Sequence, residues 1–401
     1  MLDDLVVDAL GVELLLDDPA RVEVDVQERV AAPVELDLGH VGTVPAGPRA
    51  HQRSSGRAWP PGGLERRDRD TCGGPARPAS PGIRAAAGAV RRVAATHPAA
   101  GDPMSFRIDL RPPVPEAVRA VALERLDRVM GELSGERSDD VATAVHEARK
   151  DLKKTRSLVR LLKPGLPKAR YREEADALRS VSRSLGGRRE ADALVETVDA
   201  LRDPAAGHVP AATLDRLREA LVADAPSGGG DDLDGAVRAV AEIRSRVADG
   251  ALDVDGRTAL AAGLARTYAR GYAAFAAADE DPTAERLHDW RKRVKDLWYQ
   301  QALLSPVWPT VLGAQAEEAR ALSKVLGADH DLDALDVALR DPSGPVAHVA
   351  GDTDALLPVV EARRAELLVV ARAHGLRLHA ERPRAYARRS ARYLDAPPLP
   401  R

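Results

Sequence analysis

Cysteine is almost absent from this chain of 401 residues, because only Cys72 is present. A single cysteine can neither build a disulfide framework nor supply a cysteine-based zinc site. No uninterrupted apolar run reaches the roughly 18 residues of a membrane-spanning helix. The acidic residues 1–18 have no positive charge before their apolar run, which is not typical of a secretory signal. These absences predict a cytoplasmic protein without a membrane segment.

Aromatic residues are also scarce, at 3% of a chain that is 44% hydrophobic. A core with so few rings must consist of Ala, Leu and Val, which favours helix-on-helix packing over aromatic-rich strands. The predicted fold class is therefore all-α. Charged residues reach 30%, yet the formal net charge is only -3. This balance excludes a generally cationic protein, so any site for anions has to be local.

Residues 1–103 differ from the rest of the chain in composition. They contain eleven Pro and twelve Gly but no Lys, and they show little sustained periodicity after about Val44. Such a composition is typical of loop or disorder. We interpret 1–103 as a largely disordered or non-native extension. Either Met104 is the biological start, or the extension is a genuine disordered region.

Helical periodicity begins after Met104 and continues to the C-terminus, with no credible run of strands. Turn signals predict breaks between roughly a dozen helices. They lie at Lys163–Gly165, Gly186–Gly187, Asp203–Pro204, Pro226–Gly230, Asp281–Pro282, Ser305–Pro306, Asp341–Pro342 and Arg382–Pro383.

Two segments of the helical region share one motif. Residues Val145–Lys153 and Leu287–Lys295 both follow the pattern apolar, His, acidic, any, Arg, Lys, any, apolar, Lys, at an offset of 142 residues. A second shared motif follows at Arg179–Leu194 and Arg320–Leu335, offset by 141 residues. Two long motifs in the same order indicate an internal duplication. They predict two pseudo-symmetric helical bundles, formed by a first half at 104–250 and a second half at 251–401.

Each first motif places its cations on one side of a helix. At about 100° per residue, the cations that follow His146 fall within an arc of about 120° that also contains this histidine. They are Arg149, Lys150, Lys153, Arg156 and Arg160. The equivalent arc around His288 holds Arg291, Lys292 and Lys295. An apolar stripe on another side of the first helix, with Ala148 and Leu152, can face the core.

A row of like charges without carboxylates in its arc repels itself, so it favours a polyanion or nearby acids. All eight lysines of the chain lie in or beside the motif helices. A single basic stripe is commonly a solvated face, and a single histidine is commonly a core or capping residue. The recurrence of both at matching positions favours anion binding. A phosphate chain suits such a row, because Arg forks two oxygens while Lys acts as a mobile charge. Cations beside the histidines predict mildly pH-dependent binding.

The two motifs together resemble the CHAD family (conserved histidine α-helical domain) over roughly residues 104–401. The resemblance implies two helical bundles around a basic groove, binding of inorganic polyphosphate and association with polyphosphate granules. It assigns ligand contacts to His146, Arg149, Lys153, His288, Arg291 and Lys295. From the second motif it adds Arg179, Arg183, Arg189, Arg320, Lys324 and His330. Arg189 occupies the slot of His330, and both residue types can contact phosphate. The Glu-x-Glu-x-Lys motif of an accompanying triphosphate-tunnel domain is absent from 1–103.

Three alternatives remain at this stage. A phosphohydrolase would need metal, but Glu147 and Asp289 directly follow their histidines and project about 100° away from them. We therefore predict no enzyme activity, no metal and no cofactor, with Asp192, Asp331 and Asp333 orienting cations or capping helices. Nucleic acid is a less favoured partner, because the net charge is nearly balanced and aromatics for base stacking are few. A purely structural scaffold is the third alternative. The sequence does not indicate an oligomeric state.

Overall fold

The protein is described by a computed structural model that covers residues 106–186, 189–225, 233–344, 346–349 and 354–397. These residues form eleven α-helices and several short 3-10 turns, and they contain no strand. They all belong to one unit of the chain, residues 76–401. The predicted all-α class is confirmed. The predictions for 1–103 lie outside the described residues.

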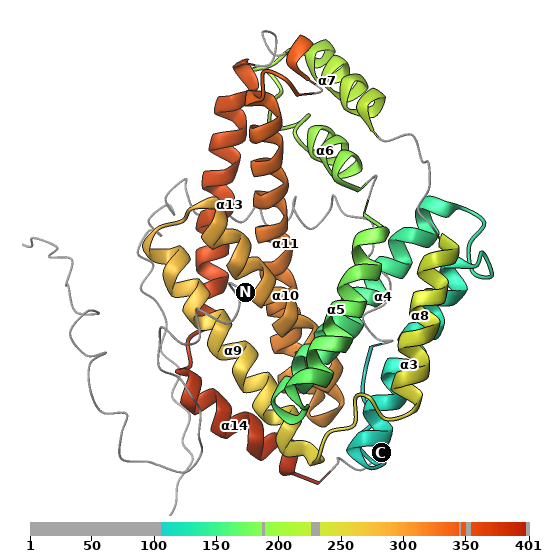
Figure 1. Cartoon of the computed structure of the whole chain (residues 1–401). Helices are drawn as coiled ribbons and strands as arrows, with labels where there is room; N and C mark the ends of the chain where they lie inside the picture. Colours follow the sequence, from blue (N-terminus) through green and yellow to red (C-terminus); the bar gives the residue numbers. More distant parts are fainter. Residues whose placement is uncertain (1–105, 187–188, 226–232, 345, 350–353, 398–401) are drawn as a thin grey trace, which may run out of the picture. The chain divides into compact units, whose positions relative to one another are not determined.

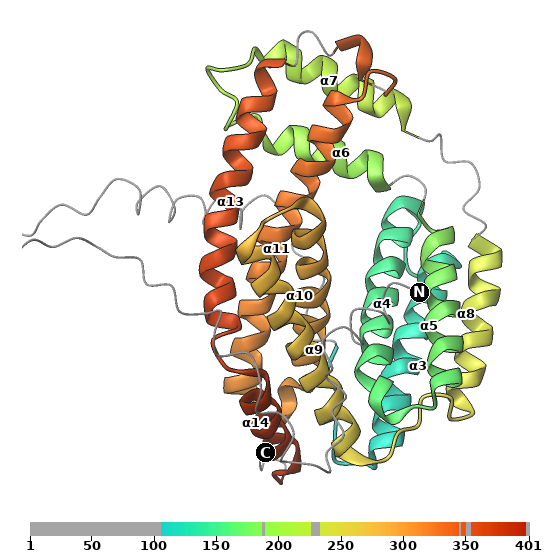
Figure 2. The same ribbon diagram turned by 60° about the vertical axis from the view of Figure 1, so that its left-hand side comes forward.

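Four helices from the first half of the chain pack side by side (Figures 1 and 2). They are α3 (Val114–Leu133), α4 (Val141–Leu162), α5 (Lys168–Ser184) and α8 (Leu233–Ala248). Helix α3 packs against α4 and α8, and α5 packs against the same two helices. We call these four helices the first helix set.

Five helices from the second half form the second helix set. They are α9 (Gly256–Glu280), α10 (Ala284–Leu304), α11 (Pro309–Arg340), α13 (Leu357–Leu378) and α14 (Pro383–Asp395). Helix α10 packs between α9 and α11, while α13 covers α11 and α14 covers α9. In the first set, the single helix α8 packs on both α3 and α5. In the second set, two separate helices, α13 and α14, pack on α11 and α9.

Two short helices of the first half lie against the second helix set. Helix α6 (Arg189–Ala200) packs on α11, and α7 (Ala211–Asp224) packs on α6 and on the 3-10 turn Ala347–Val349. Figure 1 shows both helices beside the upper part of α11 and α13. The chain therefore crosses from the first set to the second between α5 and α6, and returns to the first set with α8.

The two helix sets meet where α4 contacts α9 and α10. Ser157 of α4 donates its hydroxyl to the carbonyl of Asp296 at 3.3 Å, and Gln300 donates to the carbonyl of Ser157 at 3.2 Å. Helix α9 approaches α4 at Gly263, where an added Cβ would overlap the carbonyl oxygen of Leu161. A glycine is thus required for α9 and α4 to approach this closely.

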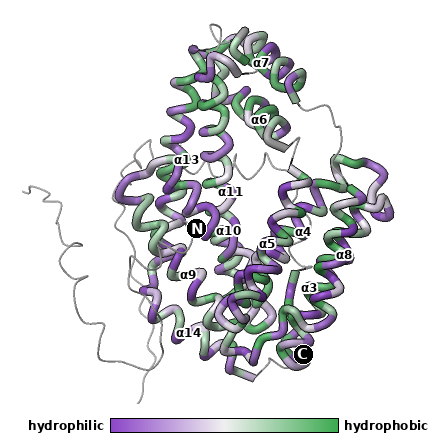
Figure 3. The backbone as a smooth tube through the Cα atoms, in the orientation of Figure 1, coloured by the Kyte–Doolittle hydropathy of each residue, from purple (hydrophilic) through white to green (hydrophobic). Residues whose placement is uncertain are grey.

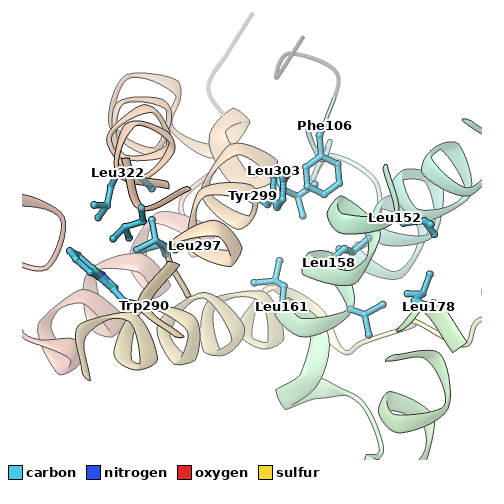
Figure 4. Packing of buried hydrophobic residues seen from close by; sticks show 14 of the residues in the cluster. Phe106, Leu152, Leu158, Leu161, Leu178, Trp290, Leu297, Tyr299, Leu303 and Leu322 are labelled. Atoms are coloured by element: carbon cyan, nitrogen blue, oxygen red, sulfur yellow. The ribbon is translucent and has the colours of Figure 1, made fainter. Parts of the chain in front are cut away.

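The core runs continuously through both sets and is built mainly from Leu, Val and Ala. In Figure 4, Leu152, Leu158, Leu161 and Leu178 belong to the core of the first set. Leu297 and Leu322 belong to that of the second. Hydrophobic and hydrophilic residues share nearly every helix in Figure 3, as expected for helices with one buried side. The scarcity of rings has an exception in the second half, since nine of the chain's twelve aromatic residues follow residue 250.

Prolines mark the helix boundaries that the sequence predicts. Both motif helices, α4 and α10, end in a 3-10 turn containing proline, at Lys163–Gly165 and Ser305–Val307. Helix α9 ends just before Asp281–Pro282, α11 ends at Arg340, and α14 begins at Pro383. These predicted breaks are confirmed, because proline fixes its own φ and disfavours helical geometry in the residue before it.

Candidate functional site

The two motif helices begin with side-chain caps. The backbone N–H of Thr143 donates to the carboxylate of Asp140 at 2.9 Å, at the start of α4. Hydrogen bonds from Thr143 hold the pKa of Asp140 below its usual value. At the start of α10, the backbone N–H of Arg286 donates to the hydroxyl of Thr283 at 3.3 Å. These caps fix where each helix begins, and hence the direction of each histidine and its cations.

The predicted division of α4 into a packing side and a charged side is confirmed. Ala148, Leu152, Val159 and Leu162 are buried. The cations Arg149, Lys150, Lys153, Arg156 and Arg160 are half-buried, and His146 is exposed. In α10, Val294 and Leu297 are buried, whereas His288, Arg291 and Lys295 are half-buried and Lys292 is exposed.

The arginine of each first motif reaches the Leu-Gly pair of the second motif. A guanidinium nitrogen of Arg149 donates to the carbonyl of Leu185, and it lies 3.9 Å from the position of a Cβ added at Gly186. In the second half, Nε of Arg291 lies 3.7 Å from a Cβ added at Gly327. The two motifs, which are separate in sequence, therefore lie together in both halves.

A cluster of arginines lies where α4 faces α5. Burial, together with the charges of Arg160 and Arg179, lowers the pKa of Arg156 to about 10. The side chain of Arg156 makes no hydrogen bond or ion pair within the described part of the chain. Arg160 binds Asp296 of α10 at 2.6 Å, and Arg179 binds Asp176 within α5 at 2.6 Å. The neighbourhood of Arg156 thus has more positive charge than these two acids neutralise.

The second half gathers two histidines instead. The rings of His288 and His330 lie 4.5 Å apart between centroids. Burial, with the charges of Lys292, His330 and Arg291, lowers the pKa of His288 to about 4. Burial also lowers the pKa of His330. Both rings are therefore neutral at pH 7. Nδ1 of His288 is buried and has no hydrogen-bond partner among the described residues.

Acids modify the basic row that the sequence predicts. Glu147, which lies outside the arc on α4, reaches Lys150 with an oxygen-to-nitrogen distance of 2.7 Å. Asp296 reaches Arg160 from the other helix set. Two cations of the α4 row are thus paired with carboxylates. Such partly exposed pairs contribute little to stability and can be replaced by a stronger anion.

One acid beside the motif cations is part of the core. Asp151 binds Arg125 at 3.2 Å, Arg128 at 3.0 Å and Lys154 at 3.0 Å. Burial alone would raise the pKa of Asp151, but the surrounding cations, Lys154 first, hold it below its usual value. Burial lowers the pKa of Lys154. Although Lys154 is one of the eight lysines in or beside the motif helices, its side chain is part of this internal network.

The remaining predicted residues occupy varied positions. Arg183 is exposed on α5, and Lys324 is half-buried on α11. Arg320 lies over the ring of Trp298, with 6.0 Å between guanidinium carbon and centroid, and it pairs with Glu317 at 3.3 Å. Arg189 begins α6, and its side chain lies outside the described residues. The structure thus clusters the cations of α4 with those of α5, and the histidine of α10 with that of α11.

Some participating residues were not predicted from the sequence. Asp296 and Trp298 closely follow Leu287–Lys295, the second copy of the first motif. Their position next to Lys295 is a signal that could have identified them. Arg364 of α13 binds Asp329 at 3.0 Å and Asp333 at 2.8 Å, thereby attaching α13 to the second motif of α11. No local pattern links Arg364 to that motif.

The described residues form neither a metal-binding cluster nor a membrane-spanning helix. Their histidine, cysteine and carboxylate side chains form no group of three or more that could hold a metal ion. None of the helices they form combines the length and apolar character needed to cross a membrane.

A model of the CHAD domain matches residues 120–340, from within α3 to the end of α11. The match covers more than half of the 401 residues and includes all four motif copies. No curated protein and no solved structure matches the chain. The family match agrees with the paired motifs and with the helices that bring them together, and the chain therefore belongs to the CHAD domain family.

Proposed function

We propose that this protein binds inorganic polyphosphate through a basic groove formed by the motif residues of α4, α5, α10 and α11. Arg156 carries the proposal. Its pKa is lowered to about 10 by burial and by Arg160 and Arg179, so the three guanidinium groups raise one another's free energy. An anion in contact with them would relieve this repulsion, and binding would gain the corresponding free energy.

The form of the anion follows from the distribution of the cations. They extend along helices rather than converging on one point, with Lys153 a full turn beyond Arg149 and Arg160 a turn beyond Arg156. Cations one turn apart are spaced by about 5.4 Å. A flexible chain with about one charge per phosphoryl unit can contact such a row repeatedly. Lys292 and Lys324 make no ion pair among the described residues and can join this contact.

We further propose that the two halves form pseudo-symmetric bundles derived from a duplication. Several matched features support this. Helices α4 and α10 each have a side-chain cap and a proline-containing end. Arg149 and Arg291 each reach the Leu-Gly pair of the second motif. The pairing of α3 with α4 matches that of α9 with α10.

We propose binding without catalysis, and association with polyphosphate granules in the cytoplasm. The carboxylates closest to the cations support a binding role, because Glu147, Asp296 and Asp333 each hold a cation. An acid that is paired in this way orients its partner and is poorly available as a general base or a metal ligand.

Titration of the full chain with long-chain polyphosphate by calorimetry, at several salt concentrations, tests the proposal. We expect a steep decrease of affinity with salt. The double variant Lys153→Ala, Lys295→Ala should lose at least about tenfold in affinity, because each lost contact is a charge-assisted hydrogen bond.

The matched control is the double variant Arg218→Gln, Arg244→Gln. It removes the same charge from two exposed arginines, which pair with Asp199 and Asp127 respectively. The control should bind like the original protein. Equal losses in both double variants would indicate an effect of net charge rather than a site. An absence of binding by a folded original protein would refute the proposed function.

A further inference from the structure

Helix α14 carries a row of exposed arginines outside the motif helices. Arg384, Arg388 and Arg392 are all exposed. The opposite side of α14, with Tyr386, Ser390 and Leu394, is buried. At about 100° per residue, the middle of the arginine row is about 160° from the middle of this buried side. The row therefore points away from α9, on which α14 packs. Helix α14 also lies beyond the residues that the family model matches.

These three arginines differ from most exposed arginines of the protein. Arg202 binds Asp199 and Asp215, Arg218 binds Asp199, and Arg244 binds Asp127. The side chains of Arg384, Arg388 and Arg392, in contrast, form no hydrogen bond or ion pair within the described part of the chain. Even Asp395, one turn beyond Arg392, is not paired with it.

The row is unfavourable in the absence of an anion. Like charges four residues apart on a helix destabilise it by a few tenths of a kcal/mol per pair, and α14 has two such pairs in succession. The spacing of about 6 Å between successive arginines allows each guanidinium to fork oxygens of a different unit of a phosphate chain.

Other polyanionic partners fit this face less well. A membrane-surface helix needs an exposed apolar side, but Tyr386 and Leu394 are each 2% exposed. Single-stranded nucleic acid is held by aromatic platforms. Tyr393 is about 140° from the middle of the row, and it packs against Trp308 with 4.7 Å between centroids. The row therefore offers charge without either kind of apolar contact.

We propose that Arg384, Arg388 and Arg392 form a second anchoring site for inorganic polyphosphate, which long chains occupy in addition to the motif cations. This inference rests on the proposed function. Occupation of both sites by one chain makes the second contact intramolecular, so it strengthens the binding of long chains only.

The test compares long-chain polyphosphate with tripolyphosphate, by calorimetry on the full chain. The triple variant Arg384→Gln, Arg388→Gln, Arg392→Gln keeps good helix formers at exposed positions. We expect it to bind long chains about tenfold more weakly. Its salt slope should be smaller by about 2, at about 0.7 for each of the three contacts. Tripolyphosphate bound at the motif cations should show unchanged affinity.

The matched control is Arg202→Gln, Arg218→Gln, Arg244→Gln, which removes the same charge from paired arginines and should bind long chains normally. Normal long-chain binding by the α14 variant, with loss in Lys153→Ala, Lys295→Ala, would overturn the second site and leave the proposed function intact. Loss of binding to phosphatidylserine vesicles or to single-stranded DNA, but not to polyphosphate, would assign the row to those partners instead. Failure of the original protein to bind polyphosphate overturns both proposals.

Discussion

The two halves of the molecule differ most clearly at one pair of equivalent positions. At the offset of 142 residues, Arg156 of α4 corresponds to Trp298 of α10. Arg156 lies among arginines, whereas Trp298 lies beneath Arg320. A ring beneath a guanidinium stabilises the cation without an anion, while a second guanidinium destabilises it. The same position thus has uncompensated positive charge nearby in the first half and a cation stabilised by a ring in the second.

The histidines show the same contrast in burial. His146 is exposed, while His288 is half-buried and its ring lies against that of His330 at a tilt of 37°. The two copies of the second motif also differ in their local structure. In the first half it spans the boundary between α5 and α6, whereas in the second half it lies inside α11, a continuous helix of 32 residues. Arg364 attaches α13 to that part of α11. The second motif of the second half is therefore held within one helix that is tied to a neighbouring helix.

The largest expected effect concerns two equivalent positions that carry opposite charges in the two halves. Asp151 corresponds to Arg293, yet Asp151 is buried with Arg125 and Lys154, whereas Arg293 pairs with the partly exposed Asp289 at 2.9 Å. Asp151→Asn leaves buried cations without their counter-charge. It should lower the free energy of unfolding by about 3–5 kcal/mol. Arg293→Gln should cost less than about 1 kcal/mol. Urea unfolding at neutral pH measures both, and equal costs would show that the two positions are equivalent in burial.

The next effect tests the histidine contrast through pH. The pKa of His288 is about 4 in the folded protein, against 6.5 for an ordinary histidine, and that of His330 is also lowered. Between these values the unfolded chain takes up protons that the folded chain does not, so stability falls as pH falls. Exchange of both residues for Gln should remove on the order of 1 kcal/mol of the stability lost between about pH 7 and pH 5.

Thermal unfolding across this pH range provides the measurement. His379 is buried and its pKa is also lowered to about 4, but it contributes equally to both proteins and cancels in the difference. The control is His146→Gln, whose exposed position should change the unfolding free energy by less than about 0.5 kcal/mol. An unchanged pH dependence in the double variant would mean that water solvates the His288 and His330 rings more than the structure indicates.

Local rules sufficed for much of this architecture. The helix ends at Pro164 and Pro306 follow from the backbone restrictions of proline, and the buried stripe of α4 follows from helical periodicity. Contacts between distant residues could not be derived in this way. The Arg160–Asp296 pair joins residues 136 positions apart, and the packing of α6 on α11 depends on how the chain crosses between the helix sets. Such contacts are set by tertiary packing, which a helical pattern does not specify.

The smallest expected effect on stability comes from removing the carboxylate that pairs with Lys150 in the first half. Glu147→Gln releases Lys150 from its carboxylate. Because a partly exposed ion pair contributes little, the free energy of unfolding should change by less than about 0.5 kcal/mol. Polyphosphate affinity should increase about twofold to fivefold, since Lys150 no longer exchanges one anion for another. Calorimetry with long-chain polyphosphate measures the gain.

Asp289→Asn is the matched variant, because Asp289 occupies the position of Glu147 in the second half and also holds a cation. Its partner Arg293 projects about 140° from His288, outside the arc of the motif cations. Neutralising Asp289 therefore frees a charge that does not face the proposed ligand, and the gain in affinity should be smaller. Equal gains would reflect net charge alone. No gain from Glu147→Gln would place Lys150 outside the contact surface and leave binding by the first half to Arg149, Lys153 and Arg156.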